Sequence, residues 1–177
     1  MSRYASFGSP LMRVLLAGVG VMAVAAGIGA PAANAAGPFQ YHAVTPCRVA
    51  DTRFADGNAN CPVTGNCAPA LVGNANQSNG RWFQIEGHCG VPSGAAAITV
   101  NVTETGPNMT VASGFLTIWP AGGTKPNVST MNFTNNDIAL ANGALVPLSQ
   151  QTGGDLAIFF GANGTVSVIL DVTGYFQ

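Results

Sequence analysis

Charged side chains are scarce in this chain. Its 177 residues contain six Lys and Arg and seven Asp and Glu, so that 7% of the residues are charged, against about 25% in a typical soluble domain. No basic patch exists that could hold a phosphate backbone, and nucleic acid is therefore excluded as an expected partner. Asn, Thr, Ser and Gly supply the polarity instead, as in many extracellular β-rich proteins.

Complete catalytic motifs are also absent from the sequence. It contains no G-x-S-x-G elbow that would present a nucleophilic serine. The two histidines, His42 and His88, are far apart, and neither has such a serine to activate. The cysteines show no paired C-x-x-C spacing of the kind that zinc sites use. We therefore predict no catalytic residue, no zinc site and no cofactor.

The longest uncharged apolar stretch lies near the N-terminus. Residues 14–30 carry no charge, follow two arginines and lead to an A-x-A site that ends at Ala35. This order is typical of a secretory signal peptide, and the run is slightly short for an uncleaved membrane anchor. We expect a signal helix within residues 1–35 and cleavage after Ala35. Residues 36–177 would then form a single secreted domain without membrane attachment, either released or retained at the cell surface.

The four cysteines, Cys47, Cys61, Cys67 and Cys89, all lie in the half of this domain nearest its N-terminus. An even number in a secreted chain predicts two disulfides, for which three pairings are possible. We favour the nested pairing, in which Cys47 pairs with Cys89 and the other two cysteines pair inside that loop. By the chain-entropy estimate the outer bridge contributes about 4 kcal/mol and the inner one about 2 kcal/mol. A zinc site that combines the cysteines with His88 is the competing interpretation.

Alternation of apolar and polar residues predicts β-strands throughout the domain. In residues 95–104, Ile98, Val100 and Val102 alternate with polar residues, and residues 165–176 repeat this period of two. Shorter candidates, separated by Gly- and Asn-rich turns, lie at residues 39–44, 48–53, 81–86, 114–120, 128–134, 144–149 and 155–160. We predict an all-β fold, an antiparallel β-sandwich of the jelly-roll or immunoglobulin-like type with about 8–9 strands.

Residues 55–80 interrupt this pattern. The segment is rich in Asn and Gly and contains two of the cysteines, so we expect a long cysteine-bound loop. Loops of this length are often functional. Asp56, Asn58 and Asn60 alternate as at the start of a calcium loop, but cysteines occupy the positions where that loop needs its Gly and its bidentate Glu. An Asx-rich turn is the favoured interpretation, and calcium binding is the weaker one.

The stretch TPCRVADTR, residues 45–53, concentrates charge that is rare elsewhere in the chain. On a strand, Asp51 and Arg53 would point to the same face. Buried carboxylates are normally paired or hydrogen-bonded. We therefore predict that Asp51 is a structural tie, which accepts backbone hydrogen bonds or pairs with Arg48, Arg53 or Arg81.

Taken in order, several short motifs resemble a β-rich extracellular repeat domain of secreted proteins from actinobacteria and other soil bacteria. The motifs are TPCRVADTR (45–53), GHCGVP (87–92), ITVNVT (98–103), GFLTIWPAG (114–122), PNVSTMNF (126–133), LANGALVPL (140–148) and LDVTGYF (170–176). The resemblance implies an extracellular module without an assigned activity and brings no catalytic residues. It also implies that the Pro-Cys and Cys-Gly-Val-Pro cysteines form the recurrent pair, which supports Cys47–Cys89.

Aromatic side chains are the main candidates for ligand binding. Trp82, Trp119 and Tyr41 could form flat platforms for sugar rings, with Arg81 beside them. Trp119 has a core interpretation as well, because strand-end tryptophans usually bury the ring and hydrogen-bond the indole N–H. Trp82 follows the long loop directly, and we expect it to be the most exposed of the set.

Three functions fit these observations. The first is a non-enzymatic extracellular binding or adhesion module for a polysaccharide or a cell-wall surface. The second is a self-associating structural surface protein, because strands with few charges leave their edges open to pairing, and a homo-oligomer would follow. The third is a small secreted hydrolase that uses Asp51 with Asp155 or Asp171, which would require two carboxyl groups within roughly 10 Å in an open cleft.

Overall fold

A computed structural model describes residues 38–73, 80–149 and 154–177 of the chain, so the predicted signal segment lies outside the described residues. The described residues form no helix, and hence none that is long and apolar enough to span a membrane. The strands are β1 (Tyr41–Asp51), β2 (Leu71–Gly73), β3 (Arg81–Phe83), β4 (Ala97–Met109), β5 (Ser113–Pro120), β6 (Met131–Thr134), β7 (Ala139–Pro147), β8 (Leu156–Phe160) and β9 (Gly164–Phe176).

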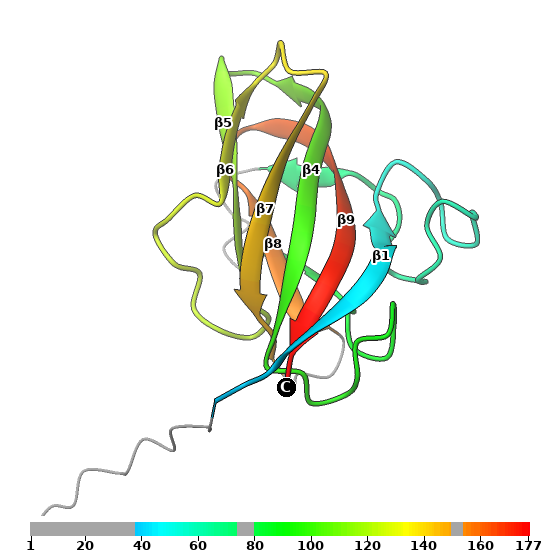
Figure 1. The fold of residues 1–177 in the computed structure, drawn as a ribbon. Helices are drawn as coiled ribbons and strands as arrows, with labels where there is room; N and C mark the ends of the chain where they lie inside the picture. Colours follow the sequence, from blue (N-terminus) through cyan, green and yellow to red (C-terminus); the bar gives the residue numbers. More distant parts are fainter. Residues whose placement is uncertain (1–37, 74–79, 150–153) are drawn as a thin grey trace, which may run out of the picture. The chain divides into compact units, whose positions relative to one another are not determined.

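These strands build two antiparallel sheets. The five-stranded sheet has the order β1-β9-β4-β7, and β2 pairs with the remaining length of β9. The four-stranded sheet has the order β3-β8-β5-β6. Figure 1 shows β1, β9, β4 and β7 side by side in one layer, with β8 behind them. The prediction of an all-β, sandwich-like fold with about nine strands is confirmed for the described residues.

The period of two in the sequence produces the core. Along β4, Ile98, Val100 and Val102 are buried, while the residues between them are partly exposed. Inward residues of the four-stranded sheet, among them Leu116 and Ile158, belong to the same buried cluster. Each fully buried aliphatic side chain of this kind contributes about 1.5–3 kcal/mol. One face of the five-stranded sheet is therefore core, and the opposite face is here called its outer face.

The structure differs from the predicted strands in several places. The strand β7 begins at Ala139, before the predicted segment 144–149, and β3 and β6 are shorter than the predicted segments 81–86 and 128–134. The two short candidates at 39–44 and 48–53 form one strand, β1, because register shifts along β9 let a single chain keep pairing across Pro46. Within the predicted loop 55–80, Leu71–Gly73 forms β2. Three residues are too few to show a period, so the sequence pattern could not reveal this strand.

Both disulfides have the nested arrangement, with Cys47 joined to Cys89 and Cys61 joined to Cys67. The first bridge links β1 to the turn that precedes β4. The second closes a short loop after β1, and both of its cysteines are buried. Two disulfides indicate an oxidising, extracellular type of environment.

Candidate functional site

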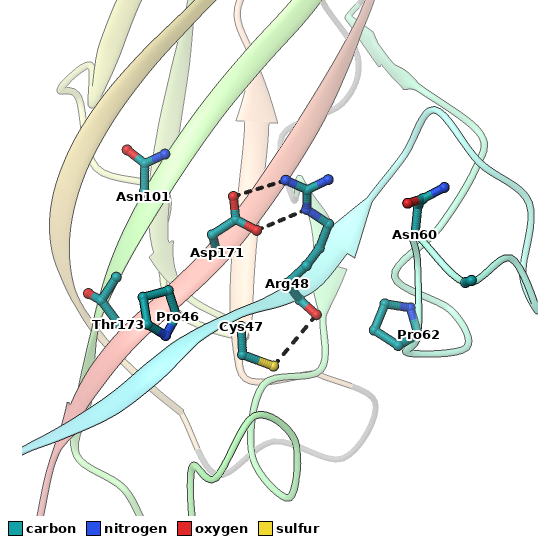
Figure 2. Close-up of a pocket in the computed structure, with 9 residues that line it drawn as sticks. Pro46, Cys47, Arg48, Asn60, Pro62, Asn101, Asp171 and Thr173 are labelled. Carbon is teal, nitrogen blue, oxygen red and sulfur yellow. Dashed lines mark hydrogen bonds and ion pairs between the residues drawn. The ribbon is translucent and has the colours of Figure 1, made fainter.

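A groove with a volume of about 610 Å³ crosses the outer face of the five-stranded sheet. Its walls come from β1, from the loop that follows β1, and from outward positions of β4 and β9 (Figure 2). The lining residues are Pro46, Cys47, Arg48, Ala59, Asn60, Pro62, Asn101, Asp171 and Thr173. The groove thus joins the predicted long loop to the polar face of the two longest strands.

Strand pairing explains why these polar side chains meet. The strand β9 lies between β1 and β4, and Asp171 is aligned with Arg48 on one side and with Asn101 on the other. Facing residues of adjacent strands place their side chains on the same face of a sheet. Since Val100 and Val102 point into the core, Asn101 between them must point outward into the groove.

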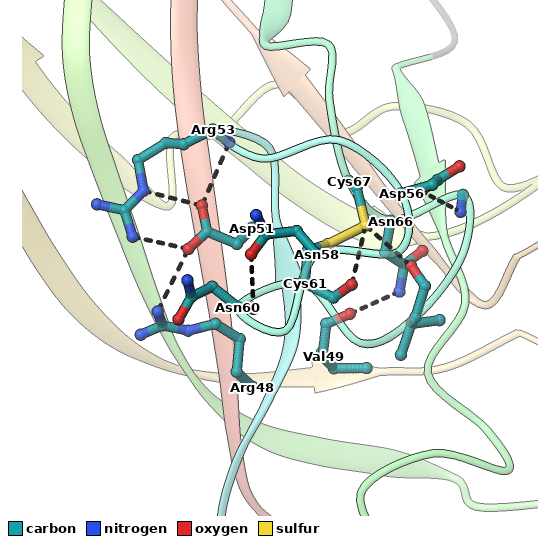
Figure 3. The surroundings of a disulfide bond; sticks show 12 residues. Arg48, Val49, Asp51, Arg53, Asp56, Asn58, Asn60, Cys61, Asn66 and Cys67 are labelled. Carbon is teal, nitrogen blue, oxygen red and sulfur yellow. Dashed lines mark hydrogen bonds and ion pairs between the residues drawn. A yellow bond between two sulfur atoms is a disulfide. The ribbon is translucent and has the colours of Figure 1, made fainter.

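Two arginines hold two carboxylates at and beside the groove, and one of these pairs, Arg48 and Asp171, lines it. Arg48 donates from Nε and Nη2 to the carboxylate oxygens of Asp171, at 2.9 and 3.2 Å. Arg53 donates to Asp51 in the same two-pronged way, at 2.8 and 2.7 Å. A further contact of 3.3 Å from Arg48 to Asp51 joins the pairs into one network (Figure 3). The network carries two positive and two negative charges, so the groove offers little net charge to a ligand.

Asp51 is completely buried at the centre of this network. Burial alone would raise the pKa of its carboxyl group. The hydrogen bonds from the Arg53 side chain and backbone, together with the charges of Arg53 and Arg48, outweigh burial and hold the pKa of Asp51 below its usual range. The carboxyl group is therefore ionised at neutral pH and fully occupied. This geometry is that of the structural tie.

An exposed aromatic ring lies beside the groove. Tyr41 is 50% exposed, and its hydroxyl lies 3.4 Å from Oγ1 of Thr99 and donates to the carbonyl of Thr173 at 3.3 Å. The ring packs directly against Gly174, where a Cβ atom would come within 2.3 Å of the tyrosine hydroxyl. Glycine at this position lets the ring lie flat on the sheet. Of the predicted binding residues, Tyr41 lies beside the groove, in contact with the lining residue Thr173.

The other predicted binding residues lie on the four-stranded sheet. Trp119 is 4% exposed, and its indole N–H donates to the carbonyl of Gly123, so it belongs to a small apolar cluster. Trp82 is partly buried against that cluster, so the prediction that it would be the most exposed of the set is wrong, and Tyr41 is more exposed. Arg81 donates to the backbone carbonyls of Gly65, Cys67 and Pro69 and so braces the short disulfide loop. The structure does not bring these three side chains to the groove.

The calcium candidates are used within their own loop. Asn58 accepts a hydrogen bond from the backbone N–H of Asn60 at 2.9 Å, which is an Asx turn. Asp56 accepts one from the N–H of Gly65 at 3.0 Å. In residues 38–73, 80–149 and 154–177, no three His, Cys, Asp or Glu side chains group in a way that could hold a metal ion. Of the three candidates, only Asn60 reaches the groove.

The three acids of the hydrolase hypothesis are all engaged. Asp51 and Asp171 lie close together, but Arg48 stands between their carboxylates. Asp155 precedes β8 in the other sheet and accepts hydrogen bonds from the N–H groups of Ile85 and Glu86 at 2.7 and 2.8 Å. Asp155 therefore cannot pair with either of the other two acids.

One buried acid was missed by the sequence analysis. Glu104 continues the inward series of β4 after Val102 and has no measurable exposure. No described residue hydrogen-bonds to either of its carboxyl oxygens with normal geometry. Burial, and then the charge of Asp137, raises the pKa of Glu104 to about 7, although the Leu140 amide favours the charged form. The alternation in NVTET was the available signal, because it places residue 104 on the apolar face.

The groove residues Asn101, Asp171 and Thr173 were not predicted as binding residues either. Their signal was present, since all three occupy polar positions of the two alternating segments. What the sequence does not contain is the alignment of β4 beside β9.

Comparison with protein-family models, with curated proteins and with solved structures finds no match to this chain.

Proposed function

We propose that this domain is a non-enzymatic extracellular binding module whose groove takes a neutral polysaccharide. The observation that carries the proposal is the groove itself, where amide and hydroxyl groups surround a charge-balanced Arg–Asp pair. Asn60, Asn101 and Thr173 offer donors and acceptors suited to sugar hydroxyls. Because the charges of the network cancel, a charged ligand would gain little over a neutral one.

The shape of the site supports an extended ligand. The outer face runs from the loop after β1 across β9 and β4 to a second shallow depression at β7. This depression has a volume of about 350 Å³ and is lined in part by Asn101, Thr173 and Leu145. Three strand spacings correspond to about 14 Å. Tyr41 adds an exposed ring next to Thr173, on which the apolar face of a sugar could stack.

The state of the acids argues against hydrolysis. A retaining or inverting glycosidase needs one carboxyl group that can donate a proton and a second that is free to attack or to activate water. Here Asp51 and Asp171 are held by guanidinium groups and Asp155 by backbone amides. A binding role uses the same side chains without requiring any of them to exchange protons.

We further propose that the sandwich is a jelly roll, secreted after cleavage at Ala35, in the extracellular family that the motifs resemble. The pairing of strands supports this fold. The β5–β6 pair is enclosed by β4–β7, then by β3–β8, and finally by β1–β9. Nested pairs distributed over two four-stranded layers characterise a jelly roll, whereas an immunoglobulin-like fold pairs its first two strands. The fold alone implies no particular ligand.

A glycan and cell-wall polysaccharide array tests the function. Purified protein with both disulfides formed is compared with Asn101→Ala and Tyr41→Ala, and the matched control is Asn132→Ala, an exposed asparagine of β6 in the other sheet. We expect neutral glycans to bind, and affinity to fall about tenfold in each groove variant through the loss of roughly 1–1.5 kcal/mol. Asn132→Ala should bind as the wild type does.

Two results would count against this site. Binding that survives both groove variants but disappears in Trp82→Ala would return the site to the four-stranded sheet. A blank array, with the fold and the disulfides verified, would remove the support for a polysaccharide ligand altogether.

A further inference from the structure

The strand β7 leaves one of its two edges open. It is nine residues long and ends the order of the five-stranded sheet, pairing with β4. Among the residues that the structure describes, no strand pairs with its other edge. Residues 139–143 are all exposed, and Leu145 is 60% exposed. A strand of this kind presents a row of unpaired N–H and C=O groups to any chain that can approach.

The other edges of the two sheets are protected in ways that β7 is not. On the opposite side, β1 contains Pro46, Arg48 and two irregularities of register, and it is tied down by the Cys47–Cys89 bridge. The edge strands β2, β3 and β6 have only three or four residues. Short strands, bulges, prolines and charges are the usual devices against edge pairing. The strand β7 has no charged residue, and its only proline is its last residue.

We propose that two copies of this chain associate through antiparallel pairing of their β7 strands, about a two-fold axis at Gly143. A two-fold interface brings the same patch together with itself, so the patch must carry no unbalanced charge of one sign, which would repel its own copy. The uncharged edge of β7 meets this condition, and it offers no charge that would select a different partner. The five-stranded sheets of the two copies would then join into one continuous sheet.

Side-chain sizes on the outer face fit this register. The axis at Gly143 places Leu145 of each copy opposite Ala141 of the other, so each large side chain meets a small one. At the axis itself nothing crowds the surface, because a Cβ atom on Gly143 would meet no atom within 4 Å. The alignment of Gly143 with Asn101, and of Leu145 with Thr99, confirms that these β7 residues face outward.

This arrangement would also place two grooves on one face. A two-fold axis perpendicular to the sheet keeps both outer faces on the same side, so a single polysaccharide could reach both grooves. Linking two sites raises the apparent affinity through effective concentration. This consequence rests on the proposed function, whereas the dimer does not.

Sedimentation of the full chain without ligand tests the dimer separately from binding. The wild type should show a dimer fraction that rises with concentration. In Ala141→Lys/Leu145→Lys, each introduced lysine would face an introduced lysine of the other copy. Because these like charges repel, the double variant should abolish the dimer. In Ala141→Glu/Leu145→Lys, each glutamate faces a lysine of the other copy, and dimerisation should return. Val111→Lys, at an exposed apolar residue outside β7, controls for added charge, and near-ultraviolet circular dichroism verifies folding.

A wild type that stays monomeric at the highest soluble concentration overturns the proposal. So does a dimer that persists unchanged in the double-lysine variant, because its interface must then lie elsewhere. Loss of the dimer in both double variants, with the fold intact, overturns the register at Gly143. A blank glycan array together with the expected sedimentation pattern would sink the binding function and leave the dimer standing.

Discussion

Two carboxyl groups of the five-stranded sheet are completely buried, and their surroundings are opposite. Asp51 lies between Arg53 and Arg48, close to the Cys61–Cys67 bridge (Figure 3). Glu104 faces the core from β4, and among the described residues nothing forms an ion pair or a normal hydrogen bond with its carboxyl group.

The difference shows how a protein with few charges can bury one. At Asp51, guanidinium groups replace the lost water, and the pKa falls. At Glu104 no described side chain replaces the lost water, and the pKa of its carboxyl group rises to about 7. The first carboxylate strengthens the fold at neutral pH, whereas the second weakens it, because a raised pKa means that folding favours the protonated form.

The largest effect on stability should come from removing both arginines beside Asp51, which would leave its carboxylate as unpaired as that of Glu104. Arg48→Ala combined with Arg53→Ala leaves a buried carboxylate without a cation, and we expect a loss of about 3–5 kcal/mol in the free energy of unfolding, measured in urea at pH 7. Adding Asp51→Asn removes the charge and should recover part of this loss. A double variant within about 0.5 kcal/mol of the wild type would show that the arginines do not support Asp51.

The next effect tests Glu104. Between pH 4.5 and about 7 the folded state binds more protons than the unfolded state, so the free energy of unfolding should fall as pH rises. Glu104→Gln removes this dependence. It should match the wild type near pH 4 and exceed it by about 3 kcal/mol at pH 8. Urea unfolding at pH 4, 6 and 8 measures both, and an equal difference at all three values would contradict the assignment.

Together, the two acids predict an optimum of stability. The contribution of Asp51 is present above its unfolded pKa of 3.8 and is lost as pH falls through its lower folded value. The contribution of Glu104 is complete below 4.5 and is lost as pH rises to about 7. With no other group considered, stability should be greatest at about pH 4–5.

A smaller loss of stability should follow from removing the Cys61–Cys67 disulfide near Asp51. Cys61→Ala/Cys67→Ala opens a loop with a sequence separation of six residues, and the chain-entropy estimate gives a loss of about 2 kcal/mol. The pH dependence that arises from Glu104 should not change, because the substitutions alter no charge and no residue of this loop hydrogen-bonds to the Glu104 carboxyl group. Unfolding of the variant with Cys47–Cys89 intact checks both points. A changed slope between pH 4.5 and 7 would mean that the two regions are coupled.

The smallest losses of stability should come from replacing either arginine of the network alone. Arg53 makes two short hydrogen bonds to Asp51, whereas Arg48 makes one contact of 3.3 Å and gives its better geometry to Asp171. Both side chains are more than a third exposed, so water limits the loss. We expect Arg48→Ala to cost about 1 kcal/mol and Arg53→Ala somewhat more. The reverse order in urea unfolding would show that Asp171 depends on Arg48 more than Asp51 depends on Arg53.

Local pattern predicted most of the secondary structure. The alternation of Ile98, Val100 and Val102 identified β4, and the same alternation identified β9, because a strand with one buried face must repeat every two residues. The same alternation continues two residues beyond Val102 and puts Glu104 on the buried face, although Glu104 was not predicted to be buried. The pairing of Asp51 with nearby arginines was also readable, since all the partners lie within a few residues of each other.

The sequence by itself therefore determined most of the strands, the presence of two disulfides and the paired acid, which depend on short spacings or on an even count of cysteines. Only the tertiary structure decided the site. The groove requires β9 to lie between β1 and β4, which are separated by more than 40 residues of chain. It also requires the loop after β1 to bring Asn60 to the same groove. The tertiary structure also decided that Trp119 is buried while Tyr41 is exposed. The physical reason is that alternation specifies which side chains share a face, whereas register and strand order, which come from packing across the whole core, specify which faces meet.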